Sequence, residues 1–129
     1  MMLFLYRGLL LLGAPLIWFY IHFRRLSGKE DTTRFKERFG HPSIGRPDEN
    51  LIWVHAASIG ESLSMLPLIG RLIGESKKLN ILVTTGTVTS AQMMEERLPE
   101  RTFHQFAPID QTLFVRRFLD HWRPDLALW

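Results

Sequence analysis

Short apolar runs alternate with longer amphipathic segments from residue 51 onward, and this alternation is the feature that most constrains the fold. We expect strands at residues 51–56, 79–84, 102–106 and 125–129, and helices at residues 59–73, 88–98 and 111–122. Strands separated by helices at this spacing favour βαβ units and a parallel sheet. Ile52–Val54 and Ile81–Val83 are continuously apolar, as strands covered on both faces should be. We therefore predict an α/β fold with a partial Rossmann-like parallel sheet in the strand order 3-2-1-4.

The N-terminal segment is long and apolar enough to enter a membrane. Residues 8–21 carry no charge, and only Arg7 is charged within residues 1–23. A span needs ~20 apolar residues, so this segment can cross the bilayer if Arg7 reaches the near interface. A helix that lies on the bilayer surface is the alternative, because Arg7, Pro15 and His22 all weaken a span. No small-residue cleavage site follows, so we interpret the segment as an uncleaved anchor.

A basic segment follows the apolar one. Residues 24–46 hold seven Lys or Arg against three acidic residues. Positive charge beside a membrane segment favours the cytoplasmic face and attracts anionic lipid headgroups. Within it we expect a short helix at residues 33–39, capped by Asp31 or Thr32 and closed by Gly40.

Three segments organise the chain. Residues 1–23 are the anchor, residues 24–50 are a basic juxtamembrane helix and linker, and residues 51–129 form the Rossmann-like domain. The linker prediction rests on residues 41–50, which are rich in turn formers. The last expected strand stops at Trp129, so we expect a truncated domain with an open sheet edge.

Composition excludes several classes of site. The net charge of +3 over 129 residues is too mild for the basic surface of a nucleic-acid-binding protein. There is no cysteine, which excludes disulfides and Cys-ligated metals. His41, His104 and His121 show no metal-ligand spacing with one another or with acidic residues. We predict no metal and no cofactor.

The first expected strand runs into a small-residue turn that is followed by one carboxylate, Glu61. Ligands of α/β proteins bind at the carboxyl ends of strands, so Glu61 is a candidate general base. Ser58 and Glu61 also match a Ser-x-x-Glu capping box, which closes a helix N-terminus and needs no further function. The helix N-terminus stabilises an ionised carboxylate, which keeps Glu61 ready to accept a proton at neutral pH. From these residues alone, both roles stay open.

Residues 53–61, Trp-Val-His-Ala-Ala-Ser-Ile-Gly-Glu, resemble the signature of the 3-deoxy-D-manno-octulosonic acid (Kdo) transferases. Four further pieces are similar to that family in the same order: residues 34–40, 84–91, 106–110 and 121–129. The likeness covers essentially the whole chain. It implies the N-terminal, acceptor-side half of a GT-B-type glycosyltransferase of lipopolysaccharide biosynthesis, at the cytoplasmic face of the inner membrane.

The resemblance also implies a reaction. Glu61 would remove a proton from a hydroxyl of the lipid A precursor, lipid IVA, and that oxygen would attack the anomeric carbon of CMP-Kdo with inversion and without a metal. Ser58 and Gly60 would shape the turn and leave room for the acceptor. CMP-Kdo would bind mainly to a C-terminal half that this chain does not contain, so we expect the chain alone to be inactive.

Five other residues are candidate acceptor contacts, each with a structural alternative. Thr85 and Thr87 either bind a phosphate or sugar at a helix N-terminus or serve in capping and turn formation. His55 either contacts the acceptor and orients the carboxylate or is a core residue. Arg34 and Arg38 either pair with glycolipid phosphates or form a solvated basic face near anionic lipid.

Two other functions fit parts of the sequence. One is a membrane-tethered, non-catalytic module that binds an anionic lipid or a protein partner. The other is a nucleotide-binding Rossmann domain, although the Gly-x-Gly-x-x-Gly turn is absent and Gly60 is the one glycine of the turn at residues 57–60. A coding sequence that continues past Trp129 through a second Rossmann-like half would favour the enzyme.

Overall fold

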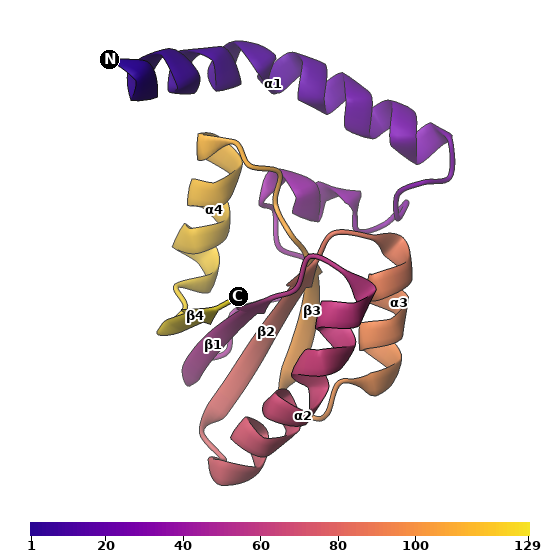
Figure 1. The fold of residues 1–129 in the computed structure, drawn as a ribbon, viewed down its shortest axis with the longest axis vertical. Coiled ribbons are helices and arrows are strands. Elements are labelled where there is room, and N and C mark those ends of the chain that lie inside the picture. The colour runs from indigo at the N-terminus through magenta and orange to yellow at the C-terminus, as the bar shows by residue number, and fades with distance from the viewer.

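A parallel sheet with helices on both faces forms the body of the molecule, and a long helix lies across one end (Figure 1). The computed structural model describes residues 1–129, apart from the side chain of Leu10. The elements are α1 (Met2–Leu26), the 3-10 helix η1 (Phe35–Phe39), β1 (Asn50–His55), α2 (Ile59–Glu75), β2 (Leu79–Thr85), α3 (Val88–Arg97), β3 (Thr102–Phe106), α4 (Thr112–Trp122) and β4 (Leu126–Leu128). The predicted Rossmann-like α/β fold is confirmed.

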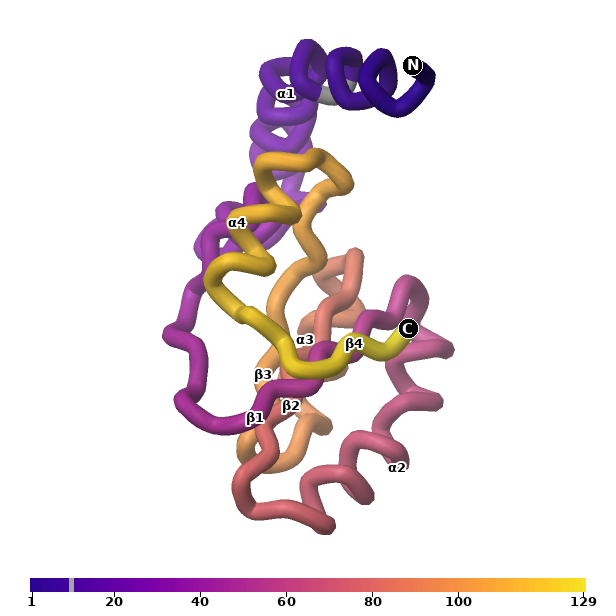
Figure 2. Tube along the Cα trace, turned by 90° about the vertical axis from the view of Figure 1, so that its left-hand side faces the viewer, coloured from indigo at the N-terminus to yellow at the C-terminus, as the bar shows by residue number. Residues whose placement is uncertain are grey.

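The strand order is β3-β2-β1-β4, and every neighbouring pair is parallel. This confirms the predicted order. The register pairs Ile52 of β1 with Ile81 of β2 on one side and with Leu126 of β4 on the other. β4 therefore runs beside β1 at the edge of the sheet (Figure 2). The order reverses between β1 and β4, and the crevice outside the carboxyl ends of these two strands is where such sheets bind ligands.

Each face of the sheet buries its own apolar cluster. On the face covered by α2 and α3, strand residues meet helix residues in a cluster of Val54, Ile69, Ile73, Ile81, Val83 and Met94. On the opposite face, α4 completes a cluster of Leu51, Leu82, Phe118 and Trp122. Burial on both faces explains why the central strands are continuously apolar in sequence.

The segment expected as a helix at residues 33–39 forms only the short 3-10 helix η1. The Asp31 carboxylate accepts hydrogen bonds from the backbone N–H groups of Thr33 and Arg34, both at 2.8 Å, which holds the preceding residues in a turn. Asp31 therefore closes the turn before η1, and the predicted side-chain cap by Asp31 or Thr32 is wrong, because the N-cap of η1 is Arg34, whose side chain makes no capping bond. η1 ends at Gly40, whose φ of 77° is left-handed. The few residues between this turn and Gly40 leave no room for a regular α-helix.

The helix α1 attaches to the body through its C-terminal half. Ile17 and Ile21 pack against a cluster that contains Phe35, Phe39 and Phe114. Other side chains along α1 are large, apolar and exposed, among them Leu12, Leu16 and Phe19. It is the one helix among the described residues that is long and apolar enough to cross a membrane.

Gly40 is required at the junction of η1 and α4. Its left-handed φ disfavours any side chain by about 1–2 kcal/mol, and an added Cβ would collide with the backbone carbonyl oxygen of Phe114. We expect Gly40→Ala to lower the free energy of unfolding by about 2–3 kcal/mol, because the obstruction is backbone and cannot rotate away. Denaturant titration of Gly40→Ala beside Gly45→Ala tests this, since a Cβ at Gly45 meets nothing within 4 Å. Equal stability of the two variants would contradict it.

Candidate active site

Glu61 stands at the first turn of α2, where the chain leaves the carboxyl end of β1. The Ser58 hydroxyl oxygen accepts the backbone N–H of Glu61 at 3.2 Å, and the Glu61 oxygen Oε2 accepts the backbone N–H of Ala57 at 2.8 Å. The capping role of Ser58 is confirmed, whereas Glu61 bonds the backbone of Ala57 and not that of Ser58, so the predicted box is only half formed. Glu61 is nevertheless exposed. Its other oxygen, Oε1, has no hydrogen-bond partner among the described residues.

Open space adjoins this carboxylate. Residues 57–61 are all exposed, and a Cβ added at Gly60 would have the Ser58 oxygen, at 3.9 Å, as its nearest neighbour. The chain itself therefore does not fill the volume beside Gly60. The role of Gly60 in admitting an acceptor stays a prediction, but nothing in the described chain blocks access to Glu61.

A hollow of about 410 Å³ lies at the reversal point of the strand order. It is lined by Trp53 and His55 of β1, by Trp129, by Val115 of α4, and by Ala107, Pro108 and Asp110 of the loop between β3 and α4. Glu61 is not among these lining residues. His55 therefore faces the hollow, whereas Glu61 stands at the start of the neighbouring helix.

Hydrogen bonds orient the His55 ring. The Trp53 indole N–H donates to the Thr84 hydroxyl oxygen at 2.8 Å, and the same oxygen lies 2.9 Å from Nδ1 of His55. Because an indole can only donate, the Thr84 oxygen accepts from Trp53, and its contact with Nδ1 fixes the orientation of the His55 ring. His55 is half-buried, so it is intermediate between a core residue and an open contact.

Arg34 lies at the centre of a polar cluster on β3. Its guanidinium contacts both Glu37 oxygens at 3.1 Å, Nδ1 of His104 at 3.0 Å and the carbonyl oxygen of His104 at 2.7 Å. It also pairs with Glu95 of α3. Nε2 of His104 lies 2.8 Å from the hydroxyl of Thr85, which is fully buried. Burial and then the charges of Arg34 and Arg38 lower the pKa of His104 to about 3.

Arg38 is buried in a second ion-pair cluster. Its Nε lies 3.1 Å from the carboxylate of Glu30. The same carboxylate also forms an ion pair with Nε of Arg24 at 3.0 Å. Its Nη2 donates to the carbonyl oxygen of Gly86 at 2.6 Å, in the loop between β2 and α3. The expected solvated basic face of Arg34 and Arg38 is therefore wrong, because Glu30 and Glu37 draw both guanidinium groups into the body.

Thr87 caps α3. Its hydroxyl oxygen accepts the backbone N–H of Ser90 at 3.1 Å, and the Ser90 hydroxyl accepts that of Thr87 at 3.3 Å. This capping box confirms the structural alternative for Thr87, which remains exposed. A phosphate or sugar contact at Thr87 stays a prediction. Among the described residues, no three His, Asp or Glu side chains converge as ligands for a metal.

Comparison with known proteins decides the family. A family model described as 3-Deoxy-D-manno-octulosonic-acid transferase (kdotransferase) matches residues 33–129. The chain belongs to this Kdo transferase family. The match begins just before η1 and includes the whole sheet and Glu61. It also includes both ion-pair clusters, except for Arg24 and Glu30, which precede residue 33.

Curated relatives carry the same name. The chain is 46% identical over 124 residues to "Probable 3-deoxy-D-manno-octulosonic acid transferase, mitochondrial" of Arabidopsis thaliana, covering 96% of this chain and 28% of that protein. It is 39% identical over 128 residues to the 3-deoxy-D-manno-octulosonic acid transferase of Rickettsia bellii, covering 99% of this chain and 31% of that protein. The enzyme of that name from Haemophilus influenzae is 30% identical over 126 residues, covering 97% and 30%. The chain thus spans about a third of the length of these relatives. No solved structure matches it.

The Kdo transferase chain also contains polar residues to which the sequence analysis gave no role, namely the buried Glu30 and Glu37 and the half-buried His104. Glu30, Glu37 and His104 organise the two clusters around Arg34 and Arg38. Glu37 further accepts the backbone N–H of Phe106 at 2.8 Å, which joins η1 to the end of β3. The available signal was the presence of two glutamates within a basic segment, where an acidic residue has arginine partners nearby.

His104 should make stability depend on pH. The pKa of His104 lies near 3 in the fold and near 6.5 in the unfolded chain. The contribution of the neutral His104 ring to the free energy of unfolding is therefore complete above pH 6.5 and is lost as the pH falls toward 3. Between these values the free energy of unfolding should fall by about 1.4 kcal/mol per pH unit from this residue. We expect His104→Gln to reduce the slope by that amount in denaturant titrations from pH 6.5 to 4. The acidic residues titrate in both the unmodified protein and the His104→Gln variant. If the free energy of unfolding had the same slope against pH in the two proteins, the role of His104 would be contradicted.

Proposed function

We propose that this chain forms the acceptor side of a glycosyltransferase that moves Kdo from CMP-Kdo to the lipid A precursor, with Glu61 as the general base. The observation that carries the proposal is the exposed Glu61 carboxylate, with one oxygen free of partners, at the carboxyl end of β1. It lies within the segment that matches the Kdo transferase family.

The proposed step is a single displacement. Glu61 takes the proton of an acceptor hydroxyl, and the oxygen attacks the anomeric carbon of Kdo from the face opposite the CMP group. The new glycosidic bond forms as the bond to the CMP phosphate breaks, and CMP leaves with that electron pair, so the configuration inverts. A general base contributes typically about 10²–10⁴-fold to such a rate. No metal takes part in the proposed reaction. CMP-Kdo is proposed to bind mainly to a part of the enzyme outside this chain.

The start of α2 suits Glu61 to this role. The Ala57 N–H bound to Oε2 and the positive end of the helix both stabilise the charged carboxylate. Oε1 is left to receive the proton. Ser58 sets the angle of the turn through its hydrogen bond to Glu61, and Gly60 keeps the adjacent volume open.

The other predicted acceptor residues divide into two groups. His55 lines the hollow, and Thr87 is exposed at the start of α3, so both remain proposed acceptor contacts. Arg34, Arg38 and Thr85 are engaged inside the body. We propose that these three position the loop between β2 and α3 and the end of β3.

We further propose that α1 attaches the enzyme to the cytoplasmic face of the inner membrane. Its exposed apolar surface and the basic residues that follow it support this placement. The acceptor is an amphiphile, so membrane attachment brings Glu61 to the surface where the acceptor resides.

A transfer assay on the intact protein, meaning this chain together with the half that binds CMP-Kdo, tests the function. CMP-Kdo and lipid IVA are the substrates, and mass spectrometry of the lipid product is the readout. We expect Kdo addition that persists in a metal chelator. An intact protein that binds vesicles but adds no Kdo would favour the non-catalytic membrane module, which the exposed apolar surface of α1 also fits.

A further inference from the structure

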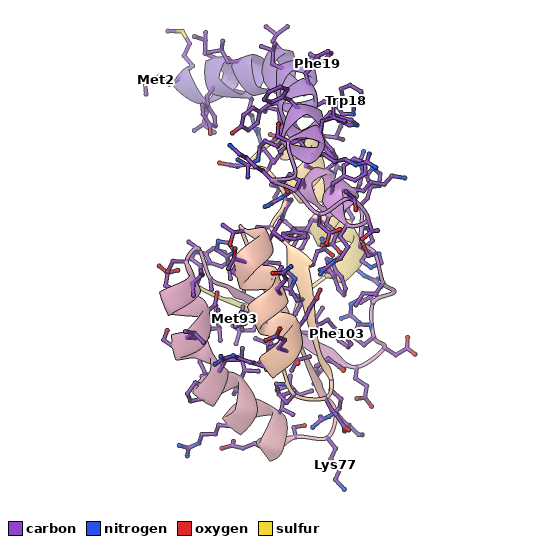
Figure 3. All side chains as sticks on the ribbon, turned by 90° about the vertical axis from the view of Figure 1, so that its right-hand side faces the viewer. Met2, Trp18, Phe19, Lys77, Met93 and Phe103 are labelled. Atoms are coloured by element: carbon purple, nitrogen blue, oxygen red, sulfur yellow. The ribbon has the colours of Figure 1, made fainter. Side chains whose placement is uncertain are left out.

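A groove of about 440 Å³ lies between the C-terminal half of α1, η1 and α4. Its apolar lining includes Trp18, Phe39 and Phe114, one from each of these elements. Its polar lining includes Lys36, His41 and Arg117. Trp18 and its neighbour Phe19 project from α1 at the end of the molecule where this helix lies (Figure 3). The groove therefore combines aromatic surface with positive charge beside the most apolar helix.

The cations of the groove differ from Arg34 and Arg38, the two arginines at and in η1. Arg34 and Arg38 pair with buried glutamates. Lys36 is exposed, and neither Lys36 nor Arg117 has an acidic partner within 4.0 Å among the described residues. Arg34 and Arg38 thus turn toward the body, whereas Lys36 of η1 lines the groove.

Arg117 is held in place with donors to spare. Its Nη1 donates to the carbonyl oxygen of Phe39 at 2.7 Å and lies 3.0 Å from Nε2 of His41. Nε and Nη2 have no hydrogen-bond partner among the described residues. Burial and then the charges of Arg117 and Lys36 lower the pKa of His41. The groove therefore presents two cations that have no carboxylate within 4.0 Å among the described residues.

We propose that this groove binds an anionic phospholipid of the bilayer, with its phosphate between Lys36 and Arg117 and an acyl chain along the aromatic side chains. A guanidinium and an ammonium form strong charge-assisted hydrogen bonds to phosphate oxygens. The inference rests on the proposed attachment of α1 to the membrane, because the groove shares Trp18 and His22 with that helix.

The position of the groove argues against the reacting sugar of the acceptor as its occupant. The lining residues come from α1, η1, His41 and α4, and none comes from the turn at residues 57–61. A reacting hydroxyl must lie within about 3 Å of its base. The groove and Glu61 are thus separate features, and a lipid held in the groove fixes how the body sits on the bilayer.

Vesicle binding by the intact protein tests the inference. The probes are phosphatidylcholine vesicles with and without phosphatidylglycerol, and the variant is Lys36→Gln/Arg117→Gln. Each basic residue near an anionic surface contributes about 1 kcal/mol, so we expect an affinity for phosphatidylglycerol vesicles about 10–30-fold lower. Binding to phosphatidylcholine vesicles should not change, because α1 is intact.

A matched control removes two cations elsewhere. Lys77 and Lys78 are exposed before β2, and Lys77 lies at the opposite end of the molecule from Trp18 (Figure 3). We expect Lys77→Gln/Lys78→Gln to bind both vesicle types as the unmodified protein does. Lys36→Glu provides a second variant that leaves the Arg117 bonds intact, and it should also lose the preference for phosphatidylglycerol.

Three results would overturn the inference. They are failure of the intact protein to bind vesicles, an unchanged preference for phosphatidylglycerol in both groove variants, and an equal loss of preference in the Lys77→Gln/Lys78→Gln control. The groove would instead be assigned to the acceptor if the groove variants kept their preference for phosphatidylglycerol vesicles. In that case they should show a raised KM for lipid IVA in phospholipid-free micelles. Vesicle binding needs no transfer reaction, so failure of the proposed enzyme activity is distinguished from failure of this site.

Discussion

Replacing Glu61 by glutamine in the intact protein should lower the rate of Kdo transfer by about 10²–10⁴-fold while leaving the fold in place. Glutamine has nearly the same shape, and its amide oxygen can still accept the Ala57 N–H that Oε2 accepts at 2.8 Å. The helix N-terminus therefore stays closed, and only the ability to take a proton is lost. Initial rates at saturating CMP-Kdo and lipid IVA measure the effect.

The alanine variant separates the two roles of this side chain. Glu61→Ala removes both the proton acceptor and the bond to Ala57, so it should match glutamine in activity but lose a further ~0.5–1 kcal/mol of stability. A glutamine variant that transfers Kdo at the normal rate would show that the carboxylate only closes its helix. The proposed chemistry would then need another base.

The alternation of apolar runs predicted the fold well because the interactions that set it are periodic. The third strand lies at residues 102–106 as expected, and the first and second differ from the prediction by about one residue at their ends. Strand order also followed from the parallel βαβ connections. η1 was the least accurate prediction, because Asp31 and Gly40 close the segment from both ends before a regular helix forms.

The predicted site residues show where sequence reasoning stops. Glu61 and Ser58 interact within four residues of chain, so spacing was enough to pair them. The partners of Arg34 lie 61 and 70 residues away, at Glu95 and His104, and no local pattern reveals such contacts. Arg34 and Arg38 therefore looked like surface cations, although long-range packing makes them internal.

Replacing Arg38 by methionine should lower the free energy of unfolding by about 3–5 kcal/mol. Arg38 and Glu30 are 7% and 5% exposed, and their side chains pair at 3.1 Å. Breaking a buried ion pair from one side leaves the other charge uncompensated, which typically costs about 3–5 kcal/mol. Arg24 still contacts Glu30, but it is more exposed and compensates only in part. Denaturant titration of the purified protein measures the loss.

A double-variant cycle distinguishes a coupled pair from two independent contacts. If Glu30 and Arg38 stabilise each other, Glu30→Gln/Arg38→Met should lose less stability than the two single variants together, with a coupling energy of about 1–3 kcal/mol. Additive losses would contradict this. Because Arg38 also donates to the Gly86 carbonyl at 2.6 Å, the single variant should loosen the loop between β2 and α3, seen as faster amide exchange there. The pair would then hold in place the loop that presents Thr87 beside the proposed acceptor site, so the basic segment after α1 would serve the site from inside the fold.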